Sequence, residues 1–199
     1  MGALIRLAAD GDAASIADVY RPSVEGSPST FEFEAPDASE MRQRIRETLT
    51  FHPWIVCEVG GEVVGYAYGT KHRVRIGYRW SVDTSVYVLE RCRRRGVGQG
   101  LYTSLVRILA AQGFFNAYAG ITLPNPASVA LHESVGFQPV GVYRHVGHKL
   151  GRWHDVGWWG LALQPHVPSP APPIGLEELP RGSAWNAMLA AGLDRIRLR

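Results

Sequence analysis

Apolar residues along the first 163 positions occur in short runs and in stripes, a pattern typical of a domain of mixed strands and helices. Residues 4–7 have the character of a short strand. Two β-rich runs, residues 54–59 and 62–68, flank Gly60-Gly61, and two glycines between such runs predict a hairpin. We expect further strands at residues 80–89, 117–123, 140–146 and 156–163.

Four segments show helical spacing of their apolar residues. The first should follow an N-cap at Asp10, and the second should span residues 37–50. The third should begin after a glycine-rich loop near residue 97. The fourth should begin at Asn125-Pro126, because Asn suits the N-cap and Pro the first helical position, and it should end at Gly136. Between the first two helices, residues 23–36 should be irregular.

The chain changes character after residue 164. Residues 165–173 include five prolines, a composition typical of an extended linker. Residues 183–196 then carry apolar side chains at amphipathic spacing. Three alternatives remain for this segment: it docks on the domain, it docks on a partner subunit, or it is a frayed tail. We therefore expect one domain over residues 1–164, followed by a linker and tail over 165–199.

Composition narrows the function. The chain has 199 residues, of which 46% are hydrophobic, so it can fold around a substantial core. Its net charge of +3 comes largely from two clusters of arginines, which suit small anions better than a nucleic-acid face. The two cysteines and seven histidines show no metal-ligand spacing. Without a signal peptide or an apolar run of about 20 residues, a cytoplasmic protein that does not enter membranes is expected.

The segment Arg93-Arg94-Arg95-Gly96-Val97-Gly98-Gln99-Gly100-Leu101 follows a strand and opens a helix. Glycines allow close backbone approach, and the first amides of a helix lack intrahelical partners, so the arrangement suits a bound phosphate. A Walker loop requires Gly-Lys-Ser/Thr, which is missing, and a dinucleotide fingerprint requires an acidic residue about 20 positions later. A plain surface turn with solvated arginines is the alternative.

Strand alternation predicts that Ser81, Asp83, Ser85 and Tyr87 share one face of residues 80–89. An amine arrives at neutral pH mostly as ammonium, and a nearby carboxylate can accept its proton. Asp83 is the candidate base, with a structural hydrogen-bond acceptor as the alternative. Ser128 and His132 share a helix face, and His132 can act as acid or base near neutrality, although a lone helical histidine is often structural.

Five separated motifs resemble the phosphinothricin acetyltransferase subfamily of the GCN5-related N-acetyltransferases (GNAT), over about residues 3–163. They are residues 80–88, the glycine loop, residues 100–103, residues 123–133 and Trp153-His154-Asp155-Val156-Gly157. The resemblance implies an α/β (α+β) fold with a mixed, splayed sheet flanked by helices. It also implies acetyl-CoA as cosubstrate, direct attack by a small amine, and a homodimer.

The resemblance implies roles for individual residues. Asp83 and His132 would be catalytic, with His132 either protonating the departing thiolate or serving as a second base, and Tyr102 would lie near the thioester sulfur. The amino-acid substrate would lie at Arg73, Arg75, Tyr78 and Tyr87. Acetyl-CoA would contact Val88, Leu89, Arg93, Arg94, Arg95, Gly96, Val97, Gly98, Gln99, Gly100, Leu101, Tyr102, Asn125 and Ser128.

The sequence departs from the subfamily at two positions. Asp83 stands where Glu is usual, which shortens the reach by one methylene and favours a relay water. Arg79 stands where the herbicide-inactivating enzymes tend to be acidic. The arginine favours a more anionic substrate than is usual in the subfamily. The first expectation is a small anionic amino acid of the phosphinothricin type. Methionine sulfone or sulfoximine acetylation, protein N-terminal acetylation and a non-catalytic acyl-CoA sensor are the alternatives.

Overall fold

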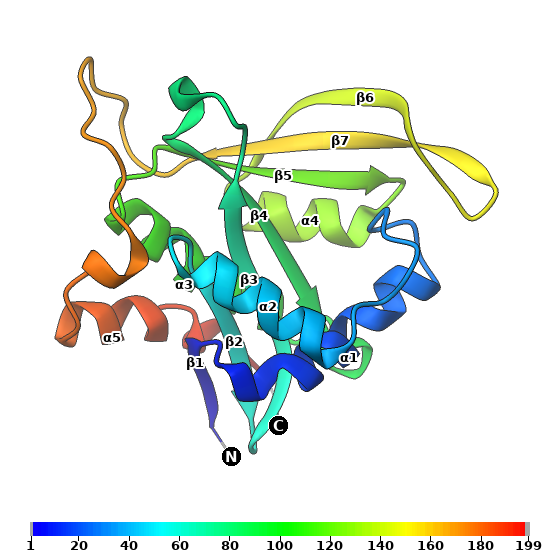
Figure 1. Ribbon diagram of the computed structural model, residues 1–199, viewed down its shortest axis with the longest axis horizontal. Coiled ribbons are helices and arrows are strands. Elements are labelled where there is room, and N and C mark those ends of the chain that lie inside the picture. The colour runs from blue at the N-terminus through cyan, green and yellow to red at the C-terminus, as the bar shows by residue number, and fades with distance from the viewer. Residues whose placement is uncertain (1, 198–199) are drawn as a thin grey trace.

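The computed structural model describes residues 2–197 and contains one seven-stranded sheet, in the order β1-β2-β3-β4-β5-β7-β6 (Figure 1). The strands are β1 (Ala3–Leu7), β2 (Trp54–Val59), β3 (Glu62–Lys71), β4 (Ser81–Val88), β5 (Asn116–Leu123), β6 (Gln138–Lys149) and β7 (Arg152–Ala162). The expected hairpin joins β2 to β3 through Gly60 and Gly61, both at positive φ (60° and 85°), where glycine is favoured.

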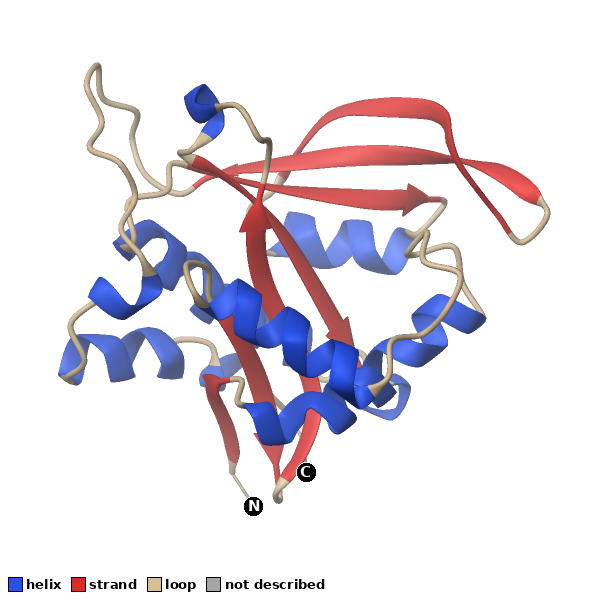
Figure 2. Ribbon diagram, viewed as in Figure 1, coloured by secondary structure: helices blue, strands red, loops and turns tan. Residues whose placement is uncertain are grey.

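The sheet is mixed because β4 and β5 are parallel, whereas every other neighbouring pair is antiparallel. The parallel pairing covers only Ser81–Asp83 against Asn116–Tyr118, after which the two strands separate. Figure 2 shows the result: strands β1–β4 and strands β5–β7 run in clearly different directions. This confirms the mixed, splayed sheet.

Helices cover both faces of the sheet. Helices α1 (Ala13–Glu25) and α2 (Ala38–Leu49) lie in front in Figure 1, over a core that includes Trp54, Val56 and Tyr66. Helix α3 (Val97–Ala111) covers the other face, where Ile55, Cys57 and Val82 join its leucines. Helix α4 (Pro126–Ser134) packs against β5 and α3. Successive residues of β2 thus enter different cores, as strand alternation requires.

Three element boundaries differ from those expected. Asp10 does not cap α1: it lies in a 3-10 turn before the helix, and its carboxylate pairs with Arg46. Helix α1 continues to Glu25 with Pro22 inside it. Strands β6 and β7 extend past residue 146 and before residue 156 to form one long hairpin that turns at Leu150-Gly151, both at positive φ.

The segment after residue 164 docks on the domain within the same chain. Trp80 Nε1 donates to the carbonyl of Ala171, and Leu176, Leu179 and Trp185 are buried. Helix α5 (Ser183–Ala190) is shorter than the expected stripe. It ends before Gly192, and a 3-10 turn at Leu193–Arg195 follows.

Candidate functional site

The candidate site lies where β4 and β5 part, and the two faces of β4 carry different groups. Asp83, Ser85 and Tyr87 face α1 and α2, whereas Val82 and its alternate neighbours face α3. Within the described residues β4 has no β5 partner after Asp83, so its backbone from Thr84 onward is available to a ligand on that side. A ligand bound between the separated ends of β4 and β5 would contact both faces of the sheet.

Asp83 is hydrogen-bonded to His72, which was not among the site residues predicted from the sequence. His72 Nδ1 lies 2.6 Å from Asp83 Oδ1, and the His72 ring stacks on Tyr118 with centroids 4.7 Å apart. Burial raises the pKa of Asp83, while the hydrogen bond from His72 and the charge of Arg73 act in the opposite direction. A half-buried carboxyl with a raised pKa and an imidazole partner has the properties of a proton acceptor.

The loop between β3 and β4 distributes its cationic residues between two places. Arg73 lies over the Trp158 ring, 5.6 Å from its centroid, on the side of Asp83, and the ring of Tyr78 lies 6.0 Å from His72. Arg75 and Arg79 instead line a separate groove of about 420 Å³ with Lys71 and the Pro172-Pro173 segment. The structure therefore brings Arg73 and Tyr78, but not Arg75, to the neighbourhood of Asp83.

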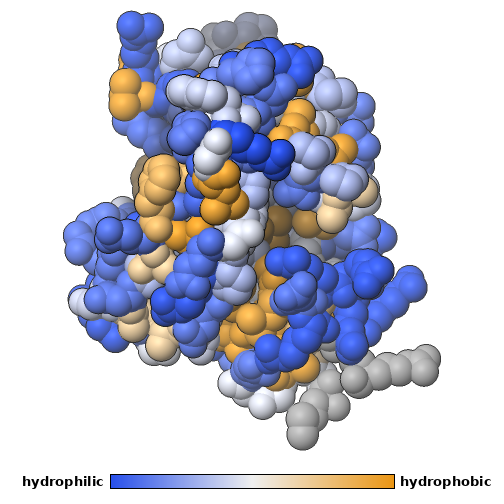
Figure 3. All heavy atoms as spheres, turned by 90° about the vertical axis from the view of Figure 1, so that its right-hand side faces the viewer, coloured by the Kyte–Doolittle hydropathy of each residue, from blue (hydrophilic) through white to orange (hydrophobic). Residues whose placement is uncertain are grey.

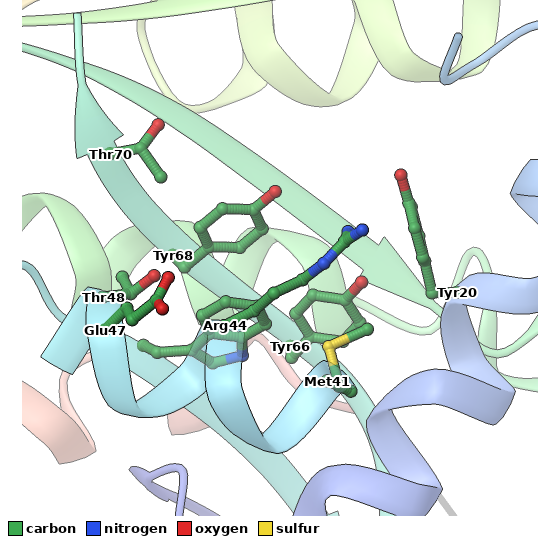
Figure 4. A pocket seen from close by; sticks show the side chains of 9 residues that line it. Tyr20, Met41, Arg44, Glu47, Thr48, Tyr66, Tyr68 and Thr70 are labelled. Atoms are coloured by element: carbon green, nitrogen blue, oxygen red, sulfur yellow. The ribbon is translucent and has the colours of Figure 1, made fainter. Parts of the chain in front are cut away.

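A cavity of about 230 Å³ lies between α2 and strand β3 (Figure 4). Its sheet wall is formed by Trp54 of β2 and by Tyr66, Tyr68 and Thr70, which alternate along one face of β3. Thr70 is the cross-strand partner of Asp83, so the two side chains are neighbours on one face and the cavity ends beside the candidate base. Tyr87, the partner of Tyr66, packs against Tyr66 and Tyr20.

The opposite wall of this cavity is held by polar contacts. Arg44 lines it and makes two bonds to Glu32, at 2.8 and 2.9 Å. Tyr20 contacts Thr30 Oγ1 at 2.7 Å and donates to Glu32. Lys149 is only 3% exposed, and its ammonium donates to the carbonyls of Val24 and Thr30. The connection between α1 and α2 is thereby tied to the β6–β7 hairpin.

On the α3 face, His132 is buried and both its ring nitrogens are bonded. Nδ1 lies 2.7 Å from the Ser128 carbonyl, and Nε2 lies 2.8 Å from the Tyr102 hydroxyl. Because a carbonyl only accepts, Nδ1 carries the hydrogen, and the Nε2 of neutral His132 accepts from Tyr102. Burial lowers the pKa of His132. Thr84 Oγ1 lies 3.4 Å beyond Tyr102, at the split in the sheet.

The glycine loop leads directly into α3. Gly96 is the N-cap at φ 78°, no side chain caps the helix, and Arg94 also has positive φ (59°). The first amides of α3 are thus available to an anion, as expected of a pyrophosphate site. Arg93, Arg94 and Arg95 are exposed and form no ion pair within residues 2–197. A Cβ on Gly98 would lie 2.9 Å from Leu131 of α4.

The remaining expected cofactor residues lie at the end of β4, in the first turn of α3 and at the start of α4. Val88 ends β4, and the amide of the next residue, Leu89, donates to the Val64 carbonyl. Gln99 donates to Ser134 of α4. Asn125 caps α4 by accepting from the Ser128 amide at 3.1 Å, which confirms the expected start of that helix.

Sequence reasoning missed the sheet wall of the cavity and the partner of Asp83. The alternation Tyr66-Ala67-Tyr68-Gly69-Thr70 contains the necessary signal, since three polar or aromatic residues share one face of a strand. His72 carried no comparable signal, because its contact with Asp83 depends on how the loop folds back.

Two further observations concern metal ligands and membrane-spanning helices. Within residues 2–197, no three His, Cys, Asp or Glu side chains are grouped as metal ligands would be. None of the described helices has the length and apolar character needed to cross a membrane.

Known proteins resemble the chain over most of its length. The Acetyltransferase (GNAT) domain family matches residues 5–158. A phosphinothricin N-acetyltransferase of Streptomyces viridochromogenes is 40% identical, over 85% of this chain and 93% of its own. An L-methionine sulfoximine/L-methionine sulfone acetyltransferase of Pseudomonas aeruginosa is 34% identical, over 85% and 100%. A crystal structure of a phosphinothricin acetyltransferase from Sinorhizobium meliloti in complex with acetyl-CoA is 35% identical, with a TM-score of 0.77 over 81% and 89%.

Proposed function

The chain belongs to the GNAT acetyltransferases, which use acetyl-CoA to acetylate an amine, and from that premise we propose that its acceptor is a small anionic amino acid of the phosphinothricin type. The observation that carries the proposal is the cavity that ends at Thr70 beside Asp83, with the Arg73 guanidinium nearby. Its volume of about 230 Å³ suits a small amino acid better than a peptide.

The residues present fit acetyl-CoA. The uncapped amides at the start of α3, flanked by three exposed arginines, would hold the pyrophosphate. The unpaired backbone of β4 after Asp83 would accompany the pantetheine arm, and Asn125 and Ser128 lie at the start of the helix that faces it. When bound, acetyl-CoA supplies an acetyl group activated as a thioester.

On the α1/α2 face, Asp83 would take the proton that the substrate ammonium must lose before its nitrogen can attack the thioester carbon. His72 orients the carboxylate by its hydrogen bond to Oδ1. Arg73 would pair with the anionic end of the substrate, since a guanidinium binds carboxylate and phosphinate oxygens through paired N–H donors. As the new C–N bond forms and the C–S bond breaks, the nitrogen loses its second proton and becomes a neutral amide, and this loss balances the proton that the departing thiolate takes up.

On the α3 face, the leaving thiolate needs a proton. Tyr102 is the group between His132 and the split, so its hydroxyl would donate the proton, and the imidazolium form of His132 would replace it from Nε2. Both states of His132 fit these contacts. Neutral Nε2 accepts from Tyr102, whereas protonated Nε2 donates to Tyr102, which then donates to Thr84. His132 would therefore act through Tyr102 rather than directly.

Methionine sulfoximine or sulfone is the second candidate substrate. The relative from Pseudomonas aeruginosa that carries this name covers the whole of its own length in the match. Its amino-acid substrates share the α-amine and carboxylate with phosphinothricin and differ in the tetrahedral end group. The aromatic wall of Tyr66 and Tyr68 suits the methyl-bearing end of either class.

Coenzyme A release with a panel of amines tests the proposal. We expect turnover with phosphinothricin to exceed that with methionine sulfoximine, methionine sulfone and short peptides with free N-termini. Arg73→Ala should raise KM for phosphinothricin by about tenfold or more while the KM for acetyl-CoA changes little, and Arg75→Ala is the matched control, since Arg75 lines the other groove. Binding of acetyl-CoA without turnover of any amine would indicate a sensor instead.

The proposed functional unit is a homodimer formed through β6. This strand is the last in the sheet, and it exposes Val140 (63%), Tyr143 (50%) and Val146 (50%). Figure 3 views the side of the molecule toward which the hairpin projects, where hydrophobic residues gather in the middle of the face between hydrophilic margins. An edge strand with an exposed apolar row is a natural surface for a second copy.

A further inference from the structure

The last described residues of the chain run along one side of α3, next to the glycine loop. Gly96, Gly100 and Ser104 are spaced four residues apart and form a stripe of small residues on this helix. We call residues 192–197, which lie against the stripe, the C-terminal strap. The opposite side of the helix, at Gly98, faces Leu131 of α4.

The contact between strap and helix is backbone on backbone. A Cβ on Gly100 would lie 2.7 Å from the Gly192 carbonyl oxygen, closer than real Cβ contacts allow. A Cβ on Gly192 would overlap the Gly100 carbonyl, and one on Gly96 would overlap the Arg195 carbonyl. Gly96 and Gly100 were expected to allow close approach of a phosphate. On the side of α3 that carries the stripe, they allow close approach of the strap instead.

Hydrogen bonds fix the strap in register. The Arg197 amide donates to the Arg95 carbonyl at 2.9 Å. The Gly192 amide donates to Ser104 Oγ at 3.2 Å, and Ser104 Oγ donates to the Leu189 carbonyl. Upstream, Trp185 is buried beneath the Arg181 guanidinium, which lies 3.8 Å from its ring centroid. The segment is therefore anchored at both ends.

The hydrogen bond from the strap to the Arg95 carbonyl fixes the orientation of a peptide group in the glycine loop. A peptide is planar and trans, so its C=O and N–H point in opposite directions. Because the strap holds the Arg95 carbonyl, the Gly96 amide of the same peptide is turned away from the strap, toward the free side of the loop. The loop has two residues at positive φ, Arg94 and Gly96. Without the contact to the strap, the glycine could adopt other backbone conformations.

We propose that the C-terminal strap is a positioning element for the pyrophosphate of acetyl-CoA: it holds the carbonyl side of the glycine loop so that the amides face the ligand. The strap lies outside residues 5–158, the part of the chain that the family matches. The inference rests on the proposed cofactor site and adds to it the segment that orders its amides. Preorganised amides bind more tightly because less ordering is required on binding.

Gly192→Ala in the full-length protein tests this inference. Gly192 has φ −100°, which alanine adopts readily, so the only change is a methyl that drives the strap off α3. Gly182→Ala is the matched control, since a Cβ there meets nothing within 4 Å. We expect Gly192→Ala to raise the Kd for coenzyme A by about tenfold, or about 1.4 kcal/mol. The kcat at saturating acetyl-CoA and the KM for the amine should stay within about twofold.

A second donor identifies the part of the ligand that is affected. Acetyl-pantetheine lacks the pyrophosphate together with the adenosine 3′-phosphate attached to it, so the preference of the wild-type enzyme for acetyl-CoA over acetyl-pantetheine should shrink in Gly192→Ala and persist in Gly182→Ala. If both variants keep the wild-type preference and affinity, the strap has no positioning role. A wild-type enzyme without any such preference would instead overturn the pyrophosphate site itself. Equal losses for both donors in Gly192→Ala would overturn the inference, because the effect of the strap would then not depend on the pyrophosphate end of the ligand.

Discussion

Asp83 is the residue on which the proposed proton transfer depends most directly. If it accepts the ammonium proton, Asp83→Asn should lower kcat by about 10²–10⁴-fold, the usual share of general base catalysis. Acetyl-CoA affinity should change little, because Asp83 faces α1 and α2 rather than α3. Asp83→Glu is the control variant: it keeps the carboxylate and adds one methylene, and we expect it to retain activity.

The pH dependence of the same residue gives an independent measurement. Burial raises the pKa of Asp83, and the carboxyl accepts a proton only when ionised, so activity should fall on acidification at a higher pH than for an ordinary carboxyl. The folded protein binds this proton more tightly than the unfolded chain, so the ionised carboxylate costs stability at neutral pH. Asp83→Asn should therefore keep or raise the Tm. A lower Tm with most of the turnover retained would show that Asp83 is structural.

At the scale of elements, the connection between α1 and α2 depends on a lysine from the far end of the sheet. Lys149→Met should leave the carbonyls of Val24 and Thr30 without their hydrogen-bond donor. We expect this to lower the free energy of unfolding by about 1–3 kcal/mol. Thr30 contacts Tyr20, a cavity residue, so the KM for the amine should also rise, by several-fold, while that for acetyl-CoA stays constant.

Urea unfolding and steady-state kinetics check the two parts of this prediction separately. Arg152→Met serves as the comparison, because Arg152 lies on the same hairpin but its side chain is exposed. A loss of stability without any change in the KM for the amine would separate the tether from the substrate cavity.

At the scale of the whole molecule, the exposed row on β6 predicts a dimer. Tyr143→Asp, or the same change at Val140, places a charge on this row and should convert the protein to a monomer in sedimentation experiments. Val74→Asp is the matched control, since Val74 is 84% exposed but lies in the β3–β4 loop. A wild-type protein that sediments as a monomer at micromolar concentration would contradict the proposal.

Local patterns in the sequence were enough for most elements of the fold. The Gly60-Gly61 hairpin, the Asn125 cap and the alternation that directs Asp83 away from α3 are all as predicted. Each depends on residues within a few positions of one another, so turn chemistry, capping and period-two burial determine them. Asp10 is not a cap, because a 3-10 turn over Asp10–Asp12 precedes α1, and its carboxylate pairs instead with Arg46, 36 residues away.

Tertiary structure alone decided which groups meet. His72 reaches Asp83, Arg73 separates from Arg75, and Lys149 reaches Thr30 across 119 residues because loops and sheet edges fold back on one another. The glycines of the loop between β4 and α3 show most clearly which contacts the sequence does not predict. Their spacing predicts close backbone approach, but only the fold reveals that Gly96 and Gly100 admit the chain's own strap. A glycine in the sequence indicates that the backbone is closely approached at that position. Which group approaches it depends on packing between segments that are distant in the sequence.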